Sequence, residues 1–193
     1  MPASNLAKQL SSTPHRKKNP TDTLNNYYTE ELVIALCGQL GTNLKEVSKE
    51  LIDILKVEYH YDCLELKLSD YLFEEEAPES DEYKRIIKGM DLGDSIRKVK
   101  GNNHLASRAI TDITLKRHEE ISVESIDDRN YKSRRKCFII NSLKHPDELE
   151  AFQKVYGKSF YLLGVFSPDS ARESYLRKII SKSDHKHIPT LIK

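Results

Sequence analysis

The stretch Leu32-Val-Ile-Ala-Leu-Cys-Gly-Gln-Leu-Gly-Thr-Asn-Leu44 joins an apolar run to a turn that contains two glycines. The run has the length of a strand and contains no charged residue, as expected for a parallel strand covered on both faces. After the turn, apolar residues recur at helical spacing as far as Leu55, and Asn43 followed by Glu46 fits a capping box. The stretch therefore predicts a strand, a glycine turn and a helix.

Further strand-like and helix-like runs alternate along the rest of the chain. Pro146 near the start of one helical pattern and Gly157 after its end are typical start and stop signals. Strands that alternate with helices predict an α/β domain with a mostly parallel sheet of at least four strands. The further strand-like runs are 63–68, 136–141 and 160–165, and the helical patterns are 83–88, 91–100, 103–117, 145–156 and 168–180.

The ends of the chain and two internal stretches differ from this pattern. Residues 1–30 are polar and lack hydrophobic periodicity, which predicts a disordered tail. The domain is expected to span 31–180, and 181–193 is expected to be an irregular C-terminal tail because it contains no convincing element. Residues 74–82 are expected to form an acidic loop, and the charged stretch 119–135 an exposed excursion.

Length and charge restrict the classes of function. The 193 residues can hold one domain of ordinary size, and 31 Lys and Arg nearly balance 30 Asp and Glu. This balance argues against a strong attraction to nucleic acid or to an anionic membrane. No apolar run approaches the roughly 20 residues of a membrane span, and the N-terminus lacks a signal-peptide core. We therefore expect a cytoplasmic protein whose three scattered cysteines are reduced and buried.

The glycine turn is the first candidate site. In a parallel α/β sheet, ligands bind outside the carboxyl ends of the strands, and the turn occupies such a position. Glycines let the backbone approach an anion closely, and the helix that follows offers N–H groups and a positive dipole end. Gly38, Gly41, Thr42 and Asn43 are therefore candidate ligands of a nucleotide phosphate. A tight turn that needs glycine only for its conformation explains the same residues equally well.

The turn departs from the motif of enzymes that transfer phosphate. Counted from Gly38, the motif G-x-x-x-x-G-K-[ST] places its second glycine at Asn43 and its lysine at Leu44. Lys45 follows one position later, about 100° around the helix. Where many such enzymes carry a magnesium-organising Asp, this chain has Asn141. Binding of a nucleotide, with or without Mg²⁺, stays open, whereas phosphoryl transfer is not expected.

Three further residues are candidate ligands of the same nucleotide. Arg97 follows a glycine-rich helix entry, and an arginine fork so placed grips the acceptor phosphate in nucleoside monophosphate kinases. Ser142 and Lys144 follow the third strand at its carboxyl end, the edge at which ligands bind. A solvent-facing arginine on a charged helix and an ordinary helix start are the respective alternatives.

The histidines form no complete metal motif. His118-Glu-Glu120 matches the first half of the zinc deaminase signature, H-x-E, but no P-C-x-x-C follows it. The pair His185 and His187 lies in the expected C-terminal tail. We therefore count the signature as absent and expect no metal ligands in this chain.

Four segments together point to a known family by their order and spacing. The segments are Ala35-Leu-Cys-Gly-Gln-Leu-Gly-Thr-Asn-Leu44, Gly89-Met-Asp-Leu-Gly-Asp-Ser-Ile-Arg97, Ser142-Leu-Lys-His-Pro-Asp-Glu-Leu149 and Phe160-Tyr-Leu-Leu-Gly-Val-Phe-Ser-Pro168. They resemble the N-terminal, P-loop-kinase-like domain of the bacterial anti-phage dCTP or dCMP deaminases. The resemblance covers about residues 30–180.

The resemblance implies a three-layer P-loop-kinase-like fold and a role in antiviral defence. In that family a C-terminal zinc domain deaminates deoxycytidine nucleotides, and the N-terminal domain is implicated in controlling this activity. The zinc belongs to that further domain, and the chain looks truncated before it. The implied partners are a nucleotide of the dNTP, dNMP, ATP or GTP class and a deaminase domain or chain, and an oligomer is also open.

Three functions remain open at this point. The first is a nucleotide-binding regulatory module that is catalytically silent as it stands. The second is a divergent deoxynucleoside monophosphate kinase that transfers phosphate from ATP. The third is an interaction domain that pairs with a separately encoded deaminase chain and binds no nucleotide. Replacing Gly41 with a bulky residue is expected to separate the first from the third, through loss of nucleotide binding.

Overall fold

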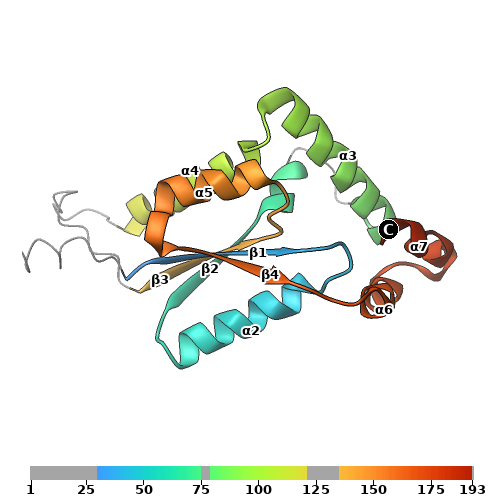
Figure 1. Cartoon of the computed structure of the whole chain (residues 1–193), viewed down its shortest axis with the longest axis horizontal. Helices are drawn as coiled ribbons and strands as arrows, with labels where there is room; N and C mark the ends of the chain where they lie inside the picture. The colour runs from blue at the N-terminus through green and yellow to red at the C-terminus, as the bar shows by residue number, and fades with distance from the viewer. Residues whose placement is uncertain (1–29, 75–78, 121–134, 193) are drawn as a thin grey trace, which may run out of the picture.

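The computed structural model describes residues 30–74, 79–120 and 135–192. Within these ranges, strands and helices alternate as the sequence predicts (Figure 1). The strands are β1 (Leu32–Gly38), β2 (Asp62–Lys67), β3 (Lys136–Asn141) and β4 (Phe160–Val165). The α-helices are α2 (Leu44–Val57), α3 (Glu82–Lys100), α4 (His104–Glu120), α5 (Pro146–Tyr156), α6 (Asp169–Ile179) and α7 (Ile188–Leu191). Short 3-10 segments span Leu68–Leu72, Gly157–Ser159 and Lys182–His187.

The four strands form one sheet in the order β2-β3-β1-β4, and all neighbouring strands are parallel. This confirms the α/β class and the parallel sheet of at least four strands. Figure 1 shows α2 on one side of the sheet and α4 with α5 on the other. The central position of β1 explains its continuous apolar sequence, because helices cover both of its faces.

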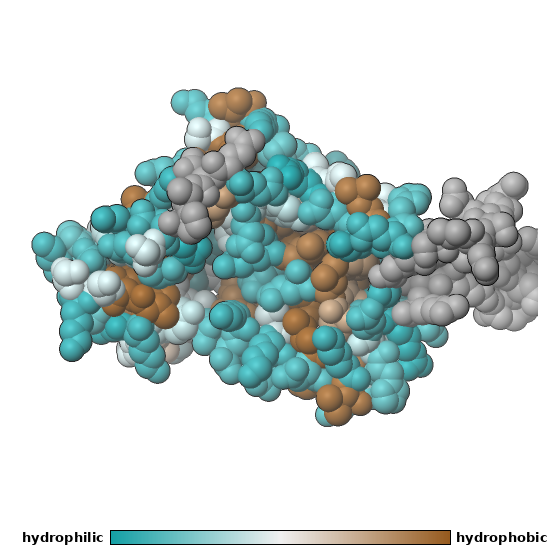
Figure 2. Space-filling model, turned by 180° about the vertical axis from the view of Figure 1, so that it is seen from behind, coloured by the Kyte–Doolittle hydropathy of each residue, from teal (hydrophilic) through white to brown (hydrophobic). Residues whose placement is uncertain are grey.

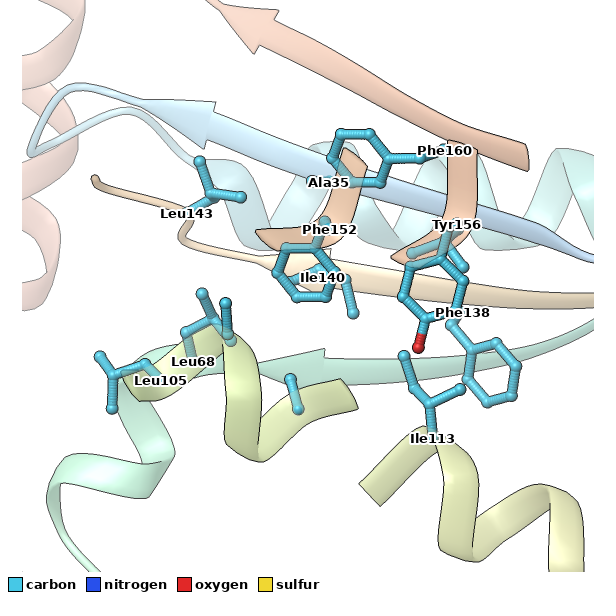
Figure 3. Packing of buried hydrophobic residues seen from close by; sticks show 13 residues of the cluster. Ala35, Leu68, Leu105, Ile113, Phe138, Ile140, Leu143, Phe152, Tyr156 and Phe160 are labelled. Atoms are coloured by element: carbon cyan, nitrogen blue, oxygen red, sulfur yellow. The ribbon is translucent and has the colours of Figure 1, made fainter. Parts of the chain in front are cut away.

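A hydrophobic core lies on each face of the sheet, between the strands and the helices that cover them. Val33 and Ala35 of β1 lie in the core beneath α4 and α5, which also contains Phe152 and Phe160 (Figure 3). The alternate residues of β1 lie in the second core, beneath α2. Figure 2 shows the face opposite to Figure 1, where hydrophobic side chains reach the surface between the two helical layers. The two cores hold β1 fixed, and they therefore fix the position of the turn that follows it.

Helix α3 differs from the sequence prediction. The patterns at 83–88 and 91–100 were expected to be separate helices, but they belong to the single helix Glu82–Lys100. Gly89 lies inside it, and a Cβ at this position would lie 3.2 Å from the Phe73 ring. Glycine in a helix interior costs about 1 kcal/mol relative to alanine, which is too little to end a long helix. The expected break is wrong: the helix continues through Gly89, and the glycine is there because a side chain would crowd the Phe73 ring.

The C-terminal segment, defined here as residues 182–192, also differs from the prediction. It was expected to be irregular, but it forms the 3-10 segment Lys182–His187 followed by α7. Ile188 is completely buried in a third cluster with Leu176 and Ile180. The expectation of an irregular tail is wrong for this segment, because its few apolar residues pack against α6 and against the sequence-distant α3 without forming a repeat of their own. The expected disordered tail at 1–30, apart from Glu30, and most of the excursion at 119–135 lie outside the described residues.

No helix in the described ranges combines the length and the apolar character needed to cross a membrane.

The thiols make folding stability depend on pH. Cys137 is buried on β3 opposite Cys63 of β2, which is half-buried, as Cys37 is. All three cysteines are free. Burial raises the pKa of Cys137 to about 12. The folded chain therefore holds this proton over a pH range in which the unfolded chain releases it.

We expect the free energy of unfolding to fall as the pH rises above 9, the ordinary pKa of the thiol, toward about 12. One proton lost only on unfolding corresponds to a slope of about 1.4 kcal/mol per pH unit. Urea unfolding at a series of alkaline pH values measures this slope, and Cys137→Ala is expected to reduce it by up to that amount. Equal slopes for the two proteins would contradict the prediction, whatever their difference in stability at neutral pH.

Candidate functional site

Two loops lie side by side at the carboxyl edge of the sheet. They are the glycine turn (residues 38–43) after β1 and the β3–α5 loop (residues 141–145). Although β1 and β3 are neighbours, the chain leaves β1 toward α2 on one face and leaves β3 toward α5 on the other. Such a switch point is the place where open α/β sheets bind ligands. The backbone N–H of Leu143 donates to the carbonyl of Leu36 (3.1 Å), which joins the second loop to β1.

The glycine turn needs glycine at position 41 for its own structure. Gly41 has a φ of +85°, a conformation that other L-residues rarely adopt. A Cβ there would lie 3.0 Å from the Cβ of Arg172 and 3.2 Å from Leu176. The N–H of Thr42 donates to the carbonyl of Gln39 (3.0 Å) and closes the turn. Substitution of Gly41 therefore tests folding as much as it tests ligand binding.

Thr42 and Asn43 connect the turn to α2. The side-chain oxygen of Asn43 accepts a hydrogen bond from the N–H of Glu46 (3.3 Å), which confirms it as the N-cap. Thr42 is 9% exposed, and its hydroxyl has no hydrogen-bond partner among the described residues. Both side chains thus lie at the N-terminus of a 14-residue helix, where the helix dipole favours an anion.

Lys144 supplies a cation at the glycine turn from the neighbouring loop. Its Nζ donates to the carbonyl oxygen of Gly38 over 2.8 Å, across the switch point. Desolvation lowers the pKa of this ammonium, although the residue as a whole is exposed. The contact brings two sequence candidates together that are 106 positions apart. The turn therefore has a lysine beside it, even though its own sequence lacks one at the expected place.

Arg97 reaches the same edge from α3, but its guanidinium is already bound. Its Nε and Nη2 donate to Oε1 of Glu148 over 3.3 and 3.0 Å. Glu148 is completely buried, and its Oε2 accepts the backbone N–H groups of Lys144 and His145. Arg97 therefore orders the β3–α5 loop through Glu148. The alternative of a solvent-facing arginine is wrong, because only 17% of the side chain is exposed.

Ser142 occupies a strained position beside a small polar cluster. Its φ is +69°, and its hydroxyl lies 3.2 Å from Oδ1 of Asn141. The amide nitrogen of Asn141 donates to the carboxylate of Glu65 (2.8 Å), which also accepts the hydroxyl of Ser48 (2.6 Å). Asn141 is thus used in a structural bond to β2. Sequence reasoning missed Glu65, because the alternation of β2 identifies the strand but not the partner of an acidic residue within it.

Arg172 is the second residue that sequence reasoning missed. It is 4% exposed on α6, and its Nε donates to the carbonyl of Leu40 in the glycine turn (2.8 Å). Its Nη1 contacts the side chains of Gln39 and Asp169, and its Nη2 donates to the carbonyl of Ile192 (3.1 Å). The position of an arginine on a charged helix gave no signal for these contacts, which depend on three segments that only the fold brings together.

The residues predicted from the sequence lie together at one edge of the sheet. Gly38, Gly41, Thr42, Asn43, Ser142 and Lys144 lie on the two adjoining loops, and Arg97 lies behind them on Glu148. In the part of the chain that the structure describes, no group of three or more His, Cys, Asp or Glu side chains is placed to hold a metal ion.

A scan against protein-family models gives no match for this chain, and a search of curated proteins gives none either. The resemblance to the deaminase family therefore stays a prediction that rests on the quoted segments.

Proposed function

We propose that this chain is a nucleotide-binding regulatory module that binds the phosphates of its ligand between the glycine turn and Lys144, and that transfers no phosphate itself. The observation that carries the proposal is the 2.8 Å hydrogen bond from the Lys144 ammonium to the carbonyl of Gly38. It places a positive charge beside the N-terminus of α2, at the switch point of the sheet.

The charge of Lys144 is available to an anion. Among the described residues, its direct hydrogen-bond partner is a neutral carbonyl, and no carboxylate lies within ion-pair distance. An ammonium held in this way can turn to a phosphate without leaving a carboxylate unpaired. The ammonium attracts the opposite charge of a phosphate more strongly than it attracts a neutral carbonyl, so the exchange is favourable. The Lys144 ammonium would then take the place of the lysine that the glycine turn lacks.

The groups that phosphoryl transfer needs are engaged elsewhere. Asn141 stands where an acidic magnesium ligand would be expected, and its amide is bound to Glu65. Arg97, the candidate for an acceptor phosphate, is held by the buried carboxylate of Glu148. These contacts support binding without turnover. A regulatory role agrees with the resemblance to the domain that is implicated in controlling a deoxycytidine nucleotide deaminase.

Lys144→Ala is expected to weaken nucleotide binding by about 10- to 150-fold, because a hydrogen bond to a charged group contributes roughly 1.5–3 kcal/mol. Titration calorimetry with dCTP, dCMP, ATP and GTP, each with and without Mg²⁺, measures the affinity of the full chain. Lys154→Ala is the matched control. Lys154 is an exposed lysine on α5 that pairs with Glu150, and its loss is expected to leave the affinity unchanged.

The other two functions predict different results in these titrations and in a separate assay that contains ATP, a deoxynucleoside monophosphate and Mg²⁺ together. If none of the four nucleotides binds the native chain, the proposal is wrong, and an interaction domain that pairs with a deaminase chain becomes the better explanation. If ATP and a deoxynucleoside monophosphate are converted to the two diphosphates, the chain is a kinase. Equal loss of affinity in the Lys144 and Lys154 variants would exclude Lys144 as the specific ligand.

A further inference from the structure

Arg172 joins the glycine turn to the C-terminal segment through one buried guanidinium. One nitrogen donates to the carbonyl of Leu40 in the turn, and another donates to the carbonyl of Ile192 in the segment. Its other two partners, the carboxylate of Asp169 and the side-chain oxygen of Gln39, belong to exposed residues, so the two backbone carbonyls are its less exposed partners. If either carbonyl moves away, an N–H group of the buried guanidinium is left without an acceptor, which costs a few kcal/mol. The two bonds therefore support each other.

The turn has little room to move independently of this arginine. Gly41 lies so close that an added Cβ would be 3.0 Å from the Cβ of Arg172 and 3.1 Å from its carbonyl oxygen. A shift of the turn backbone therefore displaces α6 or breaks the bond from Arg172 to Leu40. Either change reaches the carbonyl of Ile192, because the same guanidinium holds it.

The C-terminal segment in turn contacts α3. The ring of His187 stacks on Tyr83 at the start of α3, with centroids 5.1 Å apart. Ile188 is completely buried in the cluster that also includes Tyr83 and Ile86. Figure 1 shows α3 running from the end of the molecule that carries α7 toward α4, and Figure 2 shows a patch of hydrophobic side chains at the α6–α7 end. The segment thus lies between the turn and the helix that carries Arg97.

We propose that Arg172 couples the glycine turn to the C-terminal segment, so that occupancy of the nucleotide site changes how firmly residues 182–192 are held against α3. This regulatory role rests on the proposed nucleotide site, whereas the coupling itself is a property of the ligand-free chain. Such coupling is reciprocal: the factor by which a change at the turn alters the stability of the segment equals the factor by which a change at the segment alters the stability of the turn.

Hydrogen exchange of backbone amides in the full chain tests the coupling without a ligand. The N–H of Thr42 reports on the turn, and the N–H of Asp184 reports on the segment, since both are hydrogen-bonded. Ile188→Ala removes buried contacts of the segment and is expected to speed exchange at Thr42 by about 5- to 150-fold, the usual range of coupling between sites. In an Arg172→Lys chain, the further change Ile188→Ala is expected to leave the exchange rate at Thr42 as it is in Arg172→Lys alone, because a lysine cannot bond both carbonyls at once.

Arg177→Lys is the matched control for the arginine. Arg177 lies on the same helix and is exposed. Its guanidinium pairs with Glu173 and lies 3.4 Å from a ring nitrogen of His185 in the segment, but it is not bonded to the turn. Combined with Ile188→Ala, it should leave the faster exchange at Thr42 intact. Unchanged exchange at Thr42 in the Ile188→Ala chain, or the same increase with and without Arg172, would overturn the coupling.

A second arm adds saturating dCTP or ATP, whichever binds in calorimetry, and follows Asp184. A change in its exchange in the native chain, absent in Arg172→Lys, supports regulation of the site. Binding without any change at Asp184 overturns the regulatory proposal but leaves the nucleotide site standing. If nothing binds while Ile188→Ala still speeds exchange at Thr42, the coupling stands and the nucleotide site fails.

Discussion

Replacing Glu148 with alanine is expected to destabilise the domain by about 3–5 kcal/mol, the cost of leaving the partner of a buried ion pair without its counter-charge. Glu148 is completely buried, and its carboxylate binds Arg97 and two backbone N–H groups of the β3–α5 loop. Alanine leaves all of these donors without their acceptor. Urea unfolding monitored by circular dichroism measures the loss as a lower midpoint with an unchanged slope.

Glu150→Ala provides the control for this change. Glu150 is on the same helix but is exposed, and its partner is Lys154 one turn later. Such surface pairs contribute about 0–1 kcal/mol. A cost for Glu148→Ala no larger than that of the control would contradict the buried pair. The double variant Arg97→Ala with Glu148→Ala should cost less than the sum of the two single changes, because the second substitution removes the charge that the first leaves unpaired.

Phe152→Ala is expected to cost about 3–5 kcal/mol, the usual range for truncating a buried aromatic ring. The Phe152 side chain is completely buried between the sheet and α5, stacked on Phe160 with ring centroids 5.7 Å apart and on Tyr156 at 6.2 Å (Figure 3). Alanine removes the ring that fills the space under α5 and leaves a cavity in the core between the sheet and this helix. Thermal and urea unfolding should both show the loss.

Val155→Ala separates this packing effect from a change in helix propensity. Val155 is also on α5 but is 55% exposed, so its truncation removes little buried surface and is expected to change stability by less than about 0.5 kcal/mol. Phe152→Leu should recover part of the loss, since leucine fills some of the same volume. A Phe152→Ala protein as stable as Val155→Ala would mean that α5 does not pack on the sheet in the way described.

The elements that follow local rules could be predicted from the sequence. An uninterrupted apolar run predicted β1, and the cap at Asn43 and the proline and glycine around α5 predicted where two helices begin or end. Each of these signals acts within a few residues, so it can be read along the chain. The parallel sheet followed from the alternation of such elements.

The contacts that build the candidate site could not be predicted in the same way. Lys144 was a candidate because it follows a strand, but its bond to Gly38 depends on β1 and β3 being neighbours. Arg172 gave no signal, because its partners lie in a turn and in a C-terminal segment that lacks a hydrophobic repeat. Long-range pairs of this kind are decided by topology, which local patterns do not contain.

The order of the strands has a consequence for how the chain reaches its folded state. Leu32 of the central strand pairs with Cys137, and Val33 pairs with Phe160 on the other side, so neither partner is close in sequence. Contacts of such high separation make folding slow. At a synthesis rate of roughly 5–20 residues per second, the roughly one hundred residues that separate the first pair keep β1 without a neighbour for about 5–20 s. During that time its apolar side chains and backbone groups are exposed, and a chaperone that shields emerging chains is expected to raise the yield of folded protein.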